Sequence, residues 1–259
     1  MKKYTLVTGA SRGIGRELAL NFASNGNNLI LVARSEDDLK DLAELIENNH
    51  QVETKIMTAD LSKMGAAKNL LEQIEKKGLT IENLVNNAGF GLFGKFVNIP
   101  VEKQIAMTNL NCTALMELMH GLLPKMLENK SGRILNVAST ASFEPGPLMA
   151  TYYASKAYVL FLSEAIAEEI SDSGVSITAL CPGPTRSSFQ KEAHLEDSAM
   201  IKNKKLPTAK EVADFGYKAC MKGKRVAIHG IKNWFLVQSV RFLPRKMVTK
   251  LVKKMTKAI

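Results

Sequence analysis

The chain has 259 residues, of which 46% are hydrophobic and 23% are charged, a composition that excludes a disordered chain and supplies a folded core. Its net charge of +10 comes from one end, because residues 215–259 hold 12 of the 35 Lys and Arg residues and no Asp or Glu. The rest of the chain, with 23 basic and 25 acidic residues, is nearly neutral. This distribution argues against nucleic acid as a partner and indicates a local basic surface.

The cysteines and the N-terminus indicate the compartment. Cys112, Cys181 and Cys220 form no C-x-x-C pair and leave one cysteine over, which is typical of reduced thiols in the cytoplasm. The first residues lack the apolar stretch of a signal peptide, and no apolar run approaches the ~20 residues of a membrane-spanning helix. No linker or repeat divides residues 1–259, so we expect one cytoplasmic domain without a metal site.

Short apolar runs alternate with helix-length segments along the chain. The runs end near turn residues and read KYTLVTGA, NNLILVAR, VETKIMTAD, IENLVNNAG, GRILNVAST, VSITALCPG and RVAIHG. Strands and helices in alternation are typical of a parallel sheet covered by helices on both faces. The pattern therefore predicts an α/β fold, a Rossmann-type doubly wound parallel sheet of about seven strands.

Residues with a chemical role are expected at the carboxyl ends of these runs, where such sheets bind their ligands. The first run ends in TGASRGIG, in which Gly9, Gly13 and Gly15 have a G-x-x-x-G-x-G spacing. A glycine turn before a helix lets a pyrophosphate approach the backbone and the amides of the helix N-terminus. Three glycines alone could equally form a tight turn, but their position after the first strand favours a dinucleotide site.

The end of the second run indicates which dinucleotide binds. It carries Arg34, with no carboxylate until Glu36, and Arg12 lies in the glycine turn. Basic side chains at this position accommodate the 2′-phosphate of NADP, whereas an acidic one holds the 2′-hydroxyl of NAD. We expect NADP(H) to be preferred over NAD(H); the alternative is that both arginines are solvated surface charges.

The segment YYASK contains two adjacent tyrosines, which the helical period distinguishes. Residues four apart share a helix face, so Tyr152 lies beside Lys156 whereas Tyr153 lies beside Ala157. A neighbouring cation favours phenolate and lowers the pKa of the phenol. Tyr152 is therefore the candidate acid–base residue, although such a pair alone is more often a packed tyrosine beside a surface lysine.

Five motifs occur together and in order: TGASRGIG, NNAG, the NVAST that contains Ser139, YYASK and CPGPT. In their order and intervals they resemble the short-chain dehydrogenase/reductase family, in its single-domain branch, over essentially the whole chain. Within that family the chain looks most similar to the DltE-like or YqjQ-like group of bacterial oxidoreductases. The resemblance implies hydride transfer between a nicotinamide and a carbonyl or secondary-alcohol substrate.

The resemblance also implies three catalytic roles. Tyr152 would be the general acid or base, Lys156 would lower its pKa and bind the nicotinamide ribose, and Ser139 would polarise the substrate oxygen. Ser142 lies ten residues before Tyr152 and fits the family spacing less well. Tyr153 becomes a packing or pocket-wall residue.

The fourth catalytic residue of the family is an Asn on the helix after the fourth strand. Alignment of NLNCT with the family pattern Asn-Leu-x-Gly-Thr favours Asn109, with Cys112 in place of the usual glycine. Asn111 is its rival by proximity.

Matching the remaining motifs gives the cofactor-binding residues. Asp60 would hydrogen-bond the adenine edge, the NNAG residues would line its ribose, and the CPGPT residues would pass over the nicotinamide. For Asn86 we favour a structural role. The expected set is Gly9, Ser11, Arg12, Gly13, Ile14, Gly15, Arg34, Asp60, Leu61, Asn87, Ala88, Gly89, Tyr152, Lys156, Pro182, Gly183 and Thr185.

The segments after the last motif are less specific. Residues 186–206 lie where the family places its substrate lid, and residues 231–259 form a basic amphipathic segment. In the part from 244 to 257, an apolar stripe bordered by lysines could lie on an anionic membrane or pack on its own domain, the commoner outcome. The family resemblance also implies a homodimer or homotetramer, paired through the helices that carry Asn109 and Tyr152.

The leading functional hypothesis is an NADP(H)-dependent reductase of a carbonyl, or dehydrogenase of the matching alcohol. One alternative is a 3-oxoacyl-carrier-protein reductase, whose acidic partner would meet the basic segment. A second is a catalytically idle dinucleotide-binding sensor or scaffold, which the presence of Ser139, Tyr152 and Lys156 disfavours.

Overall fold

The computed structural model describes residues 2–187, 189 and 205–256. Most of the expected lid, residues 186–206, lies outside the described residues, as does the end of the basic segment from residue 257.

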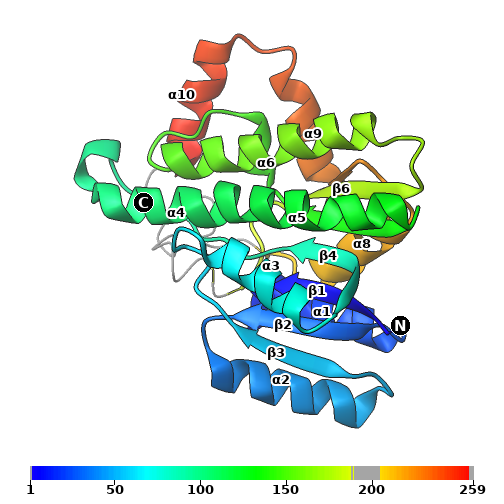
Figure 1. The fold of residues 1–259 in the computed structure, drawn as a ribbon. Helices are drawn as coiled ribbons and strands as arrows, with labels where there is room; N and C mark the ends of the chain where they lie inside the picture. The colour runs from blue at the N-terminus through cyan, green and yellow to red at the C-terminus, as the bar shows by residue number, and fades with distance from the viewer. Residues whose placement is uncertain (1, 188, 190–204, 257–259) are drawn as a thin grey trace.

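A single parallel sheet forms the centre of the molecule (Figure 1). Its strand order is β3-β2-β1-β4-β5-β6-β7, so the chain starts in the middle and winds outward in both directions. The predicted doubly wound topology is therefore confirmed. The strands are β1 (Lys3–Thr8), β2 (Asn28–Ala33), β3 (Thr54–Thr58), β4 (Thr80–Asn86), β5 (Gly132–Val137), β6 (Val175–Cys181) and β7 (Val226–Ile228).

Helices cover both faces of the sheet, and each face has its own apolar core. One core lies between the sheet and α1 (Gly13–Ser24), α2 (Glu36–Asn49) and α8 (Ala209–Met221). The other lies beneath α3 (Ala66–Lys76), α5 (Leu115–Glu128) and α6 (Ala150–Glu169). Because both faces are covered, β2 and β5 are buried at nearly every residue rather than at every second one.

Local sequence fixes several helix boundaries. The Ser35 hydroxyl accepts a hydrogen bond from the amide of Asp38 at the start of α2, as expected for an N-cap. Thr208 and Glu211 form the reciprocal capping box that begins α8. Short 3-10 turns occupy Phe96–Asn98 and Thr140–Phe143.

The helix after β4 contains an irregular turn. Helix α4 (Val101–Thr108) continues into a π-helical turn, Asn109–Ala114, before α5 begins. A π turn inserts one residue into the helical ladder and rotates the side chains that follow. This rotation decides which asparagine reaches the site.

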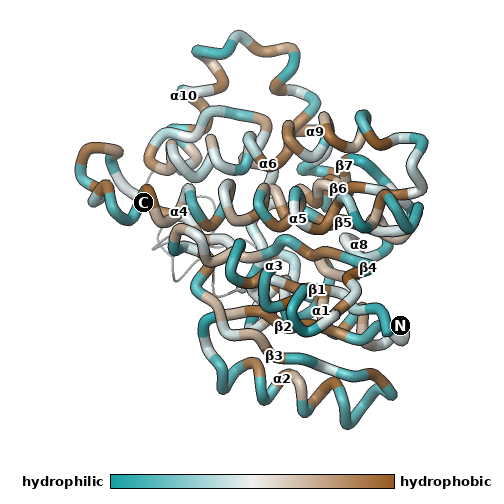
Figure 2. Tube along the Cα trace, viewed as in Figure 1, coloured by the Kyte–Doolittle hydropathy of each residue, from teal (hydrophilic) through white to brown (hydrophobic). Residues whose placement is uncertain are grey.

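The C-terminal arm, α9 (Ile231–Val240) and α10 (Arg245–Thr256), lies beside α6 at the end of the molecule away from β3 (Figure 1). Val248 and Val252 of α10 are buried against Met149 and Tyr153, and one side of the amphipathic helix therefore packs on its own domain. Figure 2 shows hydrophobic and hydrophilic residues interleaved along both helices of the arm. Among the helices of residues 2–187 and 205–256, none has the length and hydropathy needed to cross a bilayer.

Candidate active site

The turn between β1 and α1 leaves no room for side chains. Gly9 has a φ of +65°, and a Cβ atom at Gly15 would lie 2.2 Å from the Gly9 carbonyl oxygen and 2.3 Å from Asn87 Nδ2. Asn87 Nδ2 donates hydrogen bonds to the carbonyl oxygens of Thr8 (3.0 Å) and Gly9 (3.1 Å), which ties the end of β4 to the end of β1. The glycines therefore give a bare backbone cradle at the N-terminus of α1.

One end of the site is basic. Arg12 and Arg34 both line the same cavity, and both are exposed. Arg12 lies 3.3 Å from Asp38 Oδ2 across the start of α2. The Ser62 hydroxyl, 2.6 Å from Asp60 Oδ1, and the nearby Arg34 guanidinium hold the pKa of Asp60 below its usual value. An anion bound at this end would therefore meet guanidinium groups from two different loops.

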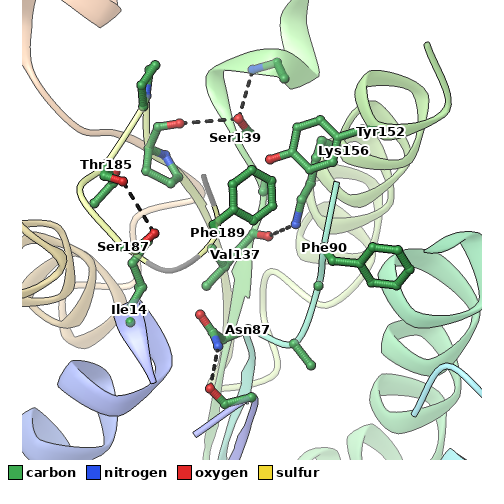
Figure 3. Close-up of a pocket in the computed structure, with 18 of the residues that line it drawn as sticks. Ile14, Asn87, Phe90, Val137, Ser139, Tyr152, Lys156, Thr185, Ser187 and Phe189 are labelled. Atoms are coloured by element: carbon green, nitrogen blue, oxygen red, sulfur yellow. Dashed lines mark hydrogen bonds between the residues drawn. The ribbon is translucent and has the colours of Figure 1, made fainter. Parts of the chain in front are cut away.

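The expected catalytic side chains meet at the other end of the cavity. Figure 3 shows the Tyr152 hydroxyl pointing towards Ser139, with Lys156 beside Tyr152. Ser139 Oγ accepts a hydrogen bond from the amide of Ala141 (3.1 Å), which fixes its hydroxyl at the end of β5. Lys156 Nζ donates to the carbonyl oxygen of Val137 (2.7 Å) and lies 5.9 Å from the centre of the Tyr152 ring.

Burial dominates the electrostatics of this end. It raises the pKa of Tyr152 to about 12, although the Ser139 hydroxyl acts in the opposite direction. It lowers the pKa of Lys156 to about 8. Burial therefore places the pKa of Tyr152 above its ordinary value, and the expectation that Lys156 lowers this pKa stays a prediction.

The π turn brings Asn111, rather than Asn109, to the catalytic end. Asn111 is buried, accepts a hydrogen bond from the amide of Phe90 (3.2 Å) and donates to the Phe90 carbonyl oxygen and to Ser155 Oγ (both 3.0 Å). Asn109 instead points to the carbonyl oxygen of Ser62, 3.4 Å away, and neither asparagine lines the cavity itself. The geometry favours Asn111, the rival position, because its hydrogen bonds hold the backbone of Phe90, which lines the cavity, and reach Ser155 on the helix that carries Tyr152.

Hydrogen bonds and packing also assign structural roles to Ser142, Tyr153 and Asn86. Ser142 donates to the carbonyl oxygen of Lys156 (2.7 Å) and is buried, so it anchors α6. Tyr153 is buried and forms part of the cavity wall. Asn86 donates to Asn136 Oδ1 (2.9 Å) inside the sheet, where it joins β4 to β5.

The cavity that joins the two ends has a volume of about 1260 Å³. Gly15, like Asn109, does not line it; Gly15 acts by allowing the close approach of Asn87. The other expected residues line it: Gly9, Ser11, Arg12, Gly13, Ile14, Arg34, Asp60, Leu61, Asn87, Ala88, Gly89, Ser139, Tyr152, Lys156, Pro182, Gly183 and Thr185.

A model of the family described as short chain dehydrogenase matches residues 3–198. The chain belongs to this family. An uncharacterized oxidoreductase of Staphylococcus saprophyticus is 33% identical to this short-chain dehydrogenase over 181 residues, 70% of this chain and 77% of that protein. A very-long-chain 3-oxoacyl-CoA reductase of Pyrenophora tritici-repentis is 32% identical over 266 residues, 95% of this chain and 73% of that protein. The solved structure of a short-chain dehydrogenase from Sphingobium yanoikuyae in complex with NADPH has a TM-score of 0.83 and 30% identity, covering 93% of this chain and 94% of that one.

The residues of this short-chain dehydrogenase fit a nicotinamide dinucleotide. The glycine cradle admits a pyrophosphate at the start of α1, where added Cβ atoms would collide with Asn87. The arginine end suits a phosphate, and the acidic Asp60 suits a donor group of an adenine. One continuous cavity connects the glycine cradle, the arginines and Asp60 with Tyr152.

Sequence reasoning missed part of the wall around Tyr152. Met149, Phe189, Leu236 and Met255 line the same cavity as Tyr152, and the rings of Phe189 and Tyr152 lie 5.4 Å apart. Glu144 adds a carboxyl group to the lining, and burial raises its pKa. For Leu236 the available signal was the apolar run of residues 234–237; the others carried no motif.

Proposed function

We propose that this short-chain dehydrogenase reduces an apolar carbonyl compound with NADPH, or oxidises the matching secondary alcohol with NADP. The observation that carries the proposal is one cavity with two arginines at one end and Ser139, Tyr152 and Lys156 at the other. An idle sensor or scaffold would have no need to keep these three side chains together. The NADPH-bound relative supports the choice of cofactor.

Each catalytic side chain has a task that its position supports. When bound, the nicotinamide dinucleotide supplies or accepts the hydride. In reduction, the Tyr152 hydroxyl donates its proton to the substrate oxygen, and the Ser139 hydroxyl donates a hydrogen bond to the same oxygen. Lys156 holds a ribose hydroxyl and favours the phenolate that remains on Tyr152. In alcohol oxidation the same proton returns to Tyr152.

Asn111 completes the proposed catalytic set as a positioning residue. Its side chain holds the backbone of Phe90 from both sides, next to Gly89. A Cβ atom at Gly89 would lie 3.0 Å from Asn111 Oδ1 and 3.5 Å from Lys156 Nζ. Asn111 therefore fixes the loop on which Lys156 and the dinucleotide depend.

A 3-oxoacyl thioester is the second candidate substrate. The relative from Pyrenophora tritici-repentis is named a very-long-chain 3-oxoacyl-CoA reductase, and it aligns with 95% of this chain. The wall formed by Met149, Phe189, Leu236 and Met255 suits an acyl chain. The basic C-terminal segment suits either the phosphates of coenzyme A or an acidic carrier protein.

Cofactor titration is the first test. The purified protein is titrated with NADPH and with NADH by calorimetry, and we expect NADPH to bind at least tenfold more tightly, a difference of about 1.4 kcal/mol. Arg34→Ala should reduce this ratio because it removes a guanidinium from the phosphate end, whereas Lys68→Ala on α3 should leave it unchanged. Equal affinities in the wild-type protein would overturn the cofactor assignment.

A substrate screen then tests the reaction. NADPH consumption is followed with apolar ketones and with 3-oxoacyl-CoA thioesters of increasing chain length. If the protein binds NADPH tightly but oxidises none of it with any of these carbonyl compounds, a sensor or scaffold becomes the better hypothesis.

A further inference from the structure

Helix α10 divides its apolar residues between two sides. On one side of α10, Val248 and Val252 are buried against the domain, and the Thr256 hydroxyl donates to the carbonyl oxygen of Pro147 (3.1 Å). Met247, Leu251 and Met255 follow one another at intervals of four and remain 48%, 44% and 39% exposed. They share one face of the helix, so packing on the domain uses only half of the apolar surface of α10.

The charges around this exposed strip have one sign. Lys250 and Lys254 are exposed. On the helix they lie beside the strip of Met247, Leu251 and Met255, on its side away from Val248. The whole of residues 215–259 contains no Asp or Glu to neutralise them. The strip is therefore an apolar edge bordered by lysines, which suits an anionic surface with an apolar interior.

The preceding helix adds large exposed side chains to the C-terminal arm. Trp234 and Phe235 of α9 are exposed with their rings 5.0 Å apart, and Phe242 is exposed in the turn before α10. Tryptophan and phenylalanine are side chains that insert at the boundary of a bilayer.

The arm also forms part of the cavity mouth. Leu236 of α9 and Met255 of α10 line the same cavity as Tyr152. Met255 belongs both to this lining and to the exposed strip. Whatever covers the strip therefore lies at the mouth of the cavity.

We propose that the C-terminal arm docks the protein on an anionic lipid bilayer, with Met247, Leu251 and Met255 at the lipid boundary and the mouth of the cavity facing it. The inference goes beyond the proposed oxidoreductase activity. A second copy of the chain is a poorer occupant, because two arms of the same positive charge repel each other.

Vesicle binding tests the docking surface. The full chain is mixed with vesicles of phosphatidylglycerol and phosphatidylcholine in equal parts, or of phosphatidylcholine alone, and bound protein is measured by flotation. Trp234 is the only tryptophan of the chain, so a blue shift of its emission and quenching by brominated lipid report burial of the arm. We expect at least tenfold tighter binding to the anionic vesicles and weaker binding as salt increases.

Two matched variants separate charge from apolar contact. Lys250→Glu/Lys254→Glu and Met247→Ser/Leu251→Ser should each lose at least tenfold in vesicle affinity, while NADPH affinity, as a check of folding, stays within twofold. Lys68→Glu/Lys210→Glu makes the same charge change on exposed lysines of α3 and α8 and should bind vesicles nearly as well as the wild type.

Three results would overturn the proposal. They are failure of the wild-type protein to bind anionic vesicles, equal losses in the control variant, and full vesicle affinity in both arm variants. Light scattering of the same proteins tests the other occupant: a dimer that the Met247→Ser/Leu251→Ser variant dissociates would place a second copy on the strip. Because NADPH binding is measured separately, loss of docking and loss of the proposed function remain distinguishable.

Discussion

Burial acts in opposite directions on the two titrating catalytic side chains. Burial raises the pKa of Tyr152 to about 12 and lowers the pKa of Lys156 to about 8. Both shifts have the same cause, because a buried site disfavours the charged form of either group. Near neutral pH the site therefore holds a proton to give on Tyr152 and an ammonium group ready to bind a ribose on Lys156.

The phenol of Tyr152 is predicted to be essential and that of Tyr153 dispensable. Tyr152→Phe should reduce turnover at least a hundredfold, because it removes the proton donor, while NADPH affinity stays within about twofold. Tyr153→Phe should change turnover by less than about threefold, since its ring packs in the cavity wall and Tyr152, not Tyr153, is the proposed proton donor. The measurement is single-turnover oxidation of NADPH at saturating carbonyl substrate. Comparable losses in both variants would contradict the assignment.

Lys156 predicts how cofactor affinity depends on pH. Its ammonium form binds the ribose, so NADPH affinity should be constant below about pH 8 and fall as pH rises through this value. Tyr152 remains protonated over this range and cannot cause the fall. Calorimetric titration between pH 6.5 and 10 measures the profile. Lys156→Met should bind more weakly and show no such fall, and a wild-type-like profile in this variant would assign the titration to another group.

At the scale of elements, the π turn Asn109–Ala114 points its side chains in directions that a regular helix would not give them. The sequence favoured Asn109 by matching NLNCT to the family pattern, and such a match carries no information about the helical geometry of the segment. The inserted residue leaves Asn111 between the Phe90 backbone and Ser155. An insertion of this kind has no signature in apolar periodicity, which explains why the two asparagines could not be separated from sequence.

The π turn therefore predicts unequal effects of two asparagine substitutions. Asn111→Ala should lower turnover at least tenfold and destabilise the fold by about 1–3 kcal/mol, because it leaves the partly buried amide and carbonyl of Phe90 without their side-chain partner. Asn109→Ala removes one long hydrogen bond to Ser62 and should change the free energy of unfolding by under about 1 kcal/mol. Denaturant unfolding and steady-state kinetics measure both effects. Equal losses from the two substitutions would argue against a special role for Asn111.

Elements whose chemistry is local were predictable, and surfaces assembled from distant segments were not. The strands and the glycine turn depend on neighbours in sequence, so their patterns indicated them correctly. The caps at Ser35 and Thr208 are equally local. The cavity wall at Met149 and Met255 depends on α6 and α10 meeting in space. The pKa of Tyr152 likewise depends on burial by tertiary packing, which the spacing of Tyr152 and Lys156 in the sequence does not indicate.

At the scale of the whole molecule, exposed apolar side chains on α4 and α6 indicate a second surface, separate from the C-terminal arm. Ile105 of α4 and Tyr158 and Phe161 of α6 are exposed, with Phe161 64% accessible. These helices adjoin the π turn and carry Tyr152, and we propose that they form the homo-oligomer interface.

Phe161→Asp should convert the proposed oligomer to monomers, because it places a charge on this apolar surface. Light scattering after gel filtration measures the mass. Phe242→Asp, which alters an equally exposed ring on the arm, should leave the oligomer intact. A wild-type monomer, or dissociation by Phe242→Asp alone, would place the interface elsewhere.

The link that Asn87 makes between β1 and β4 also bears on how the chain folds. Strands β1, β2 and β3 are consecutive, but β1 must pair with β4 across more than seventy residues before Asn87 can reach Thr8 and Gly9. The dinucleotide cradle therefore cannot exist in an intermediate that contains only the first three strands. A ligand bound there joins the early and late halves of the sheet, so it favours only the completed fold and slows its opening. Recovery of cofactor binding during refolding should consequently report the meeting of the two halves rather than the formation of either one.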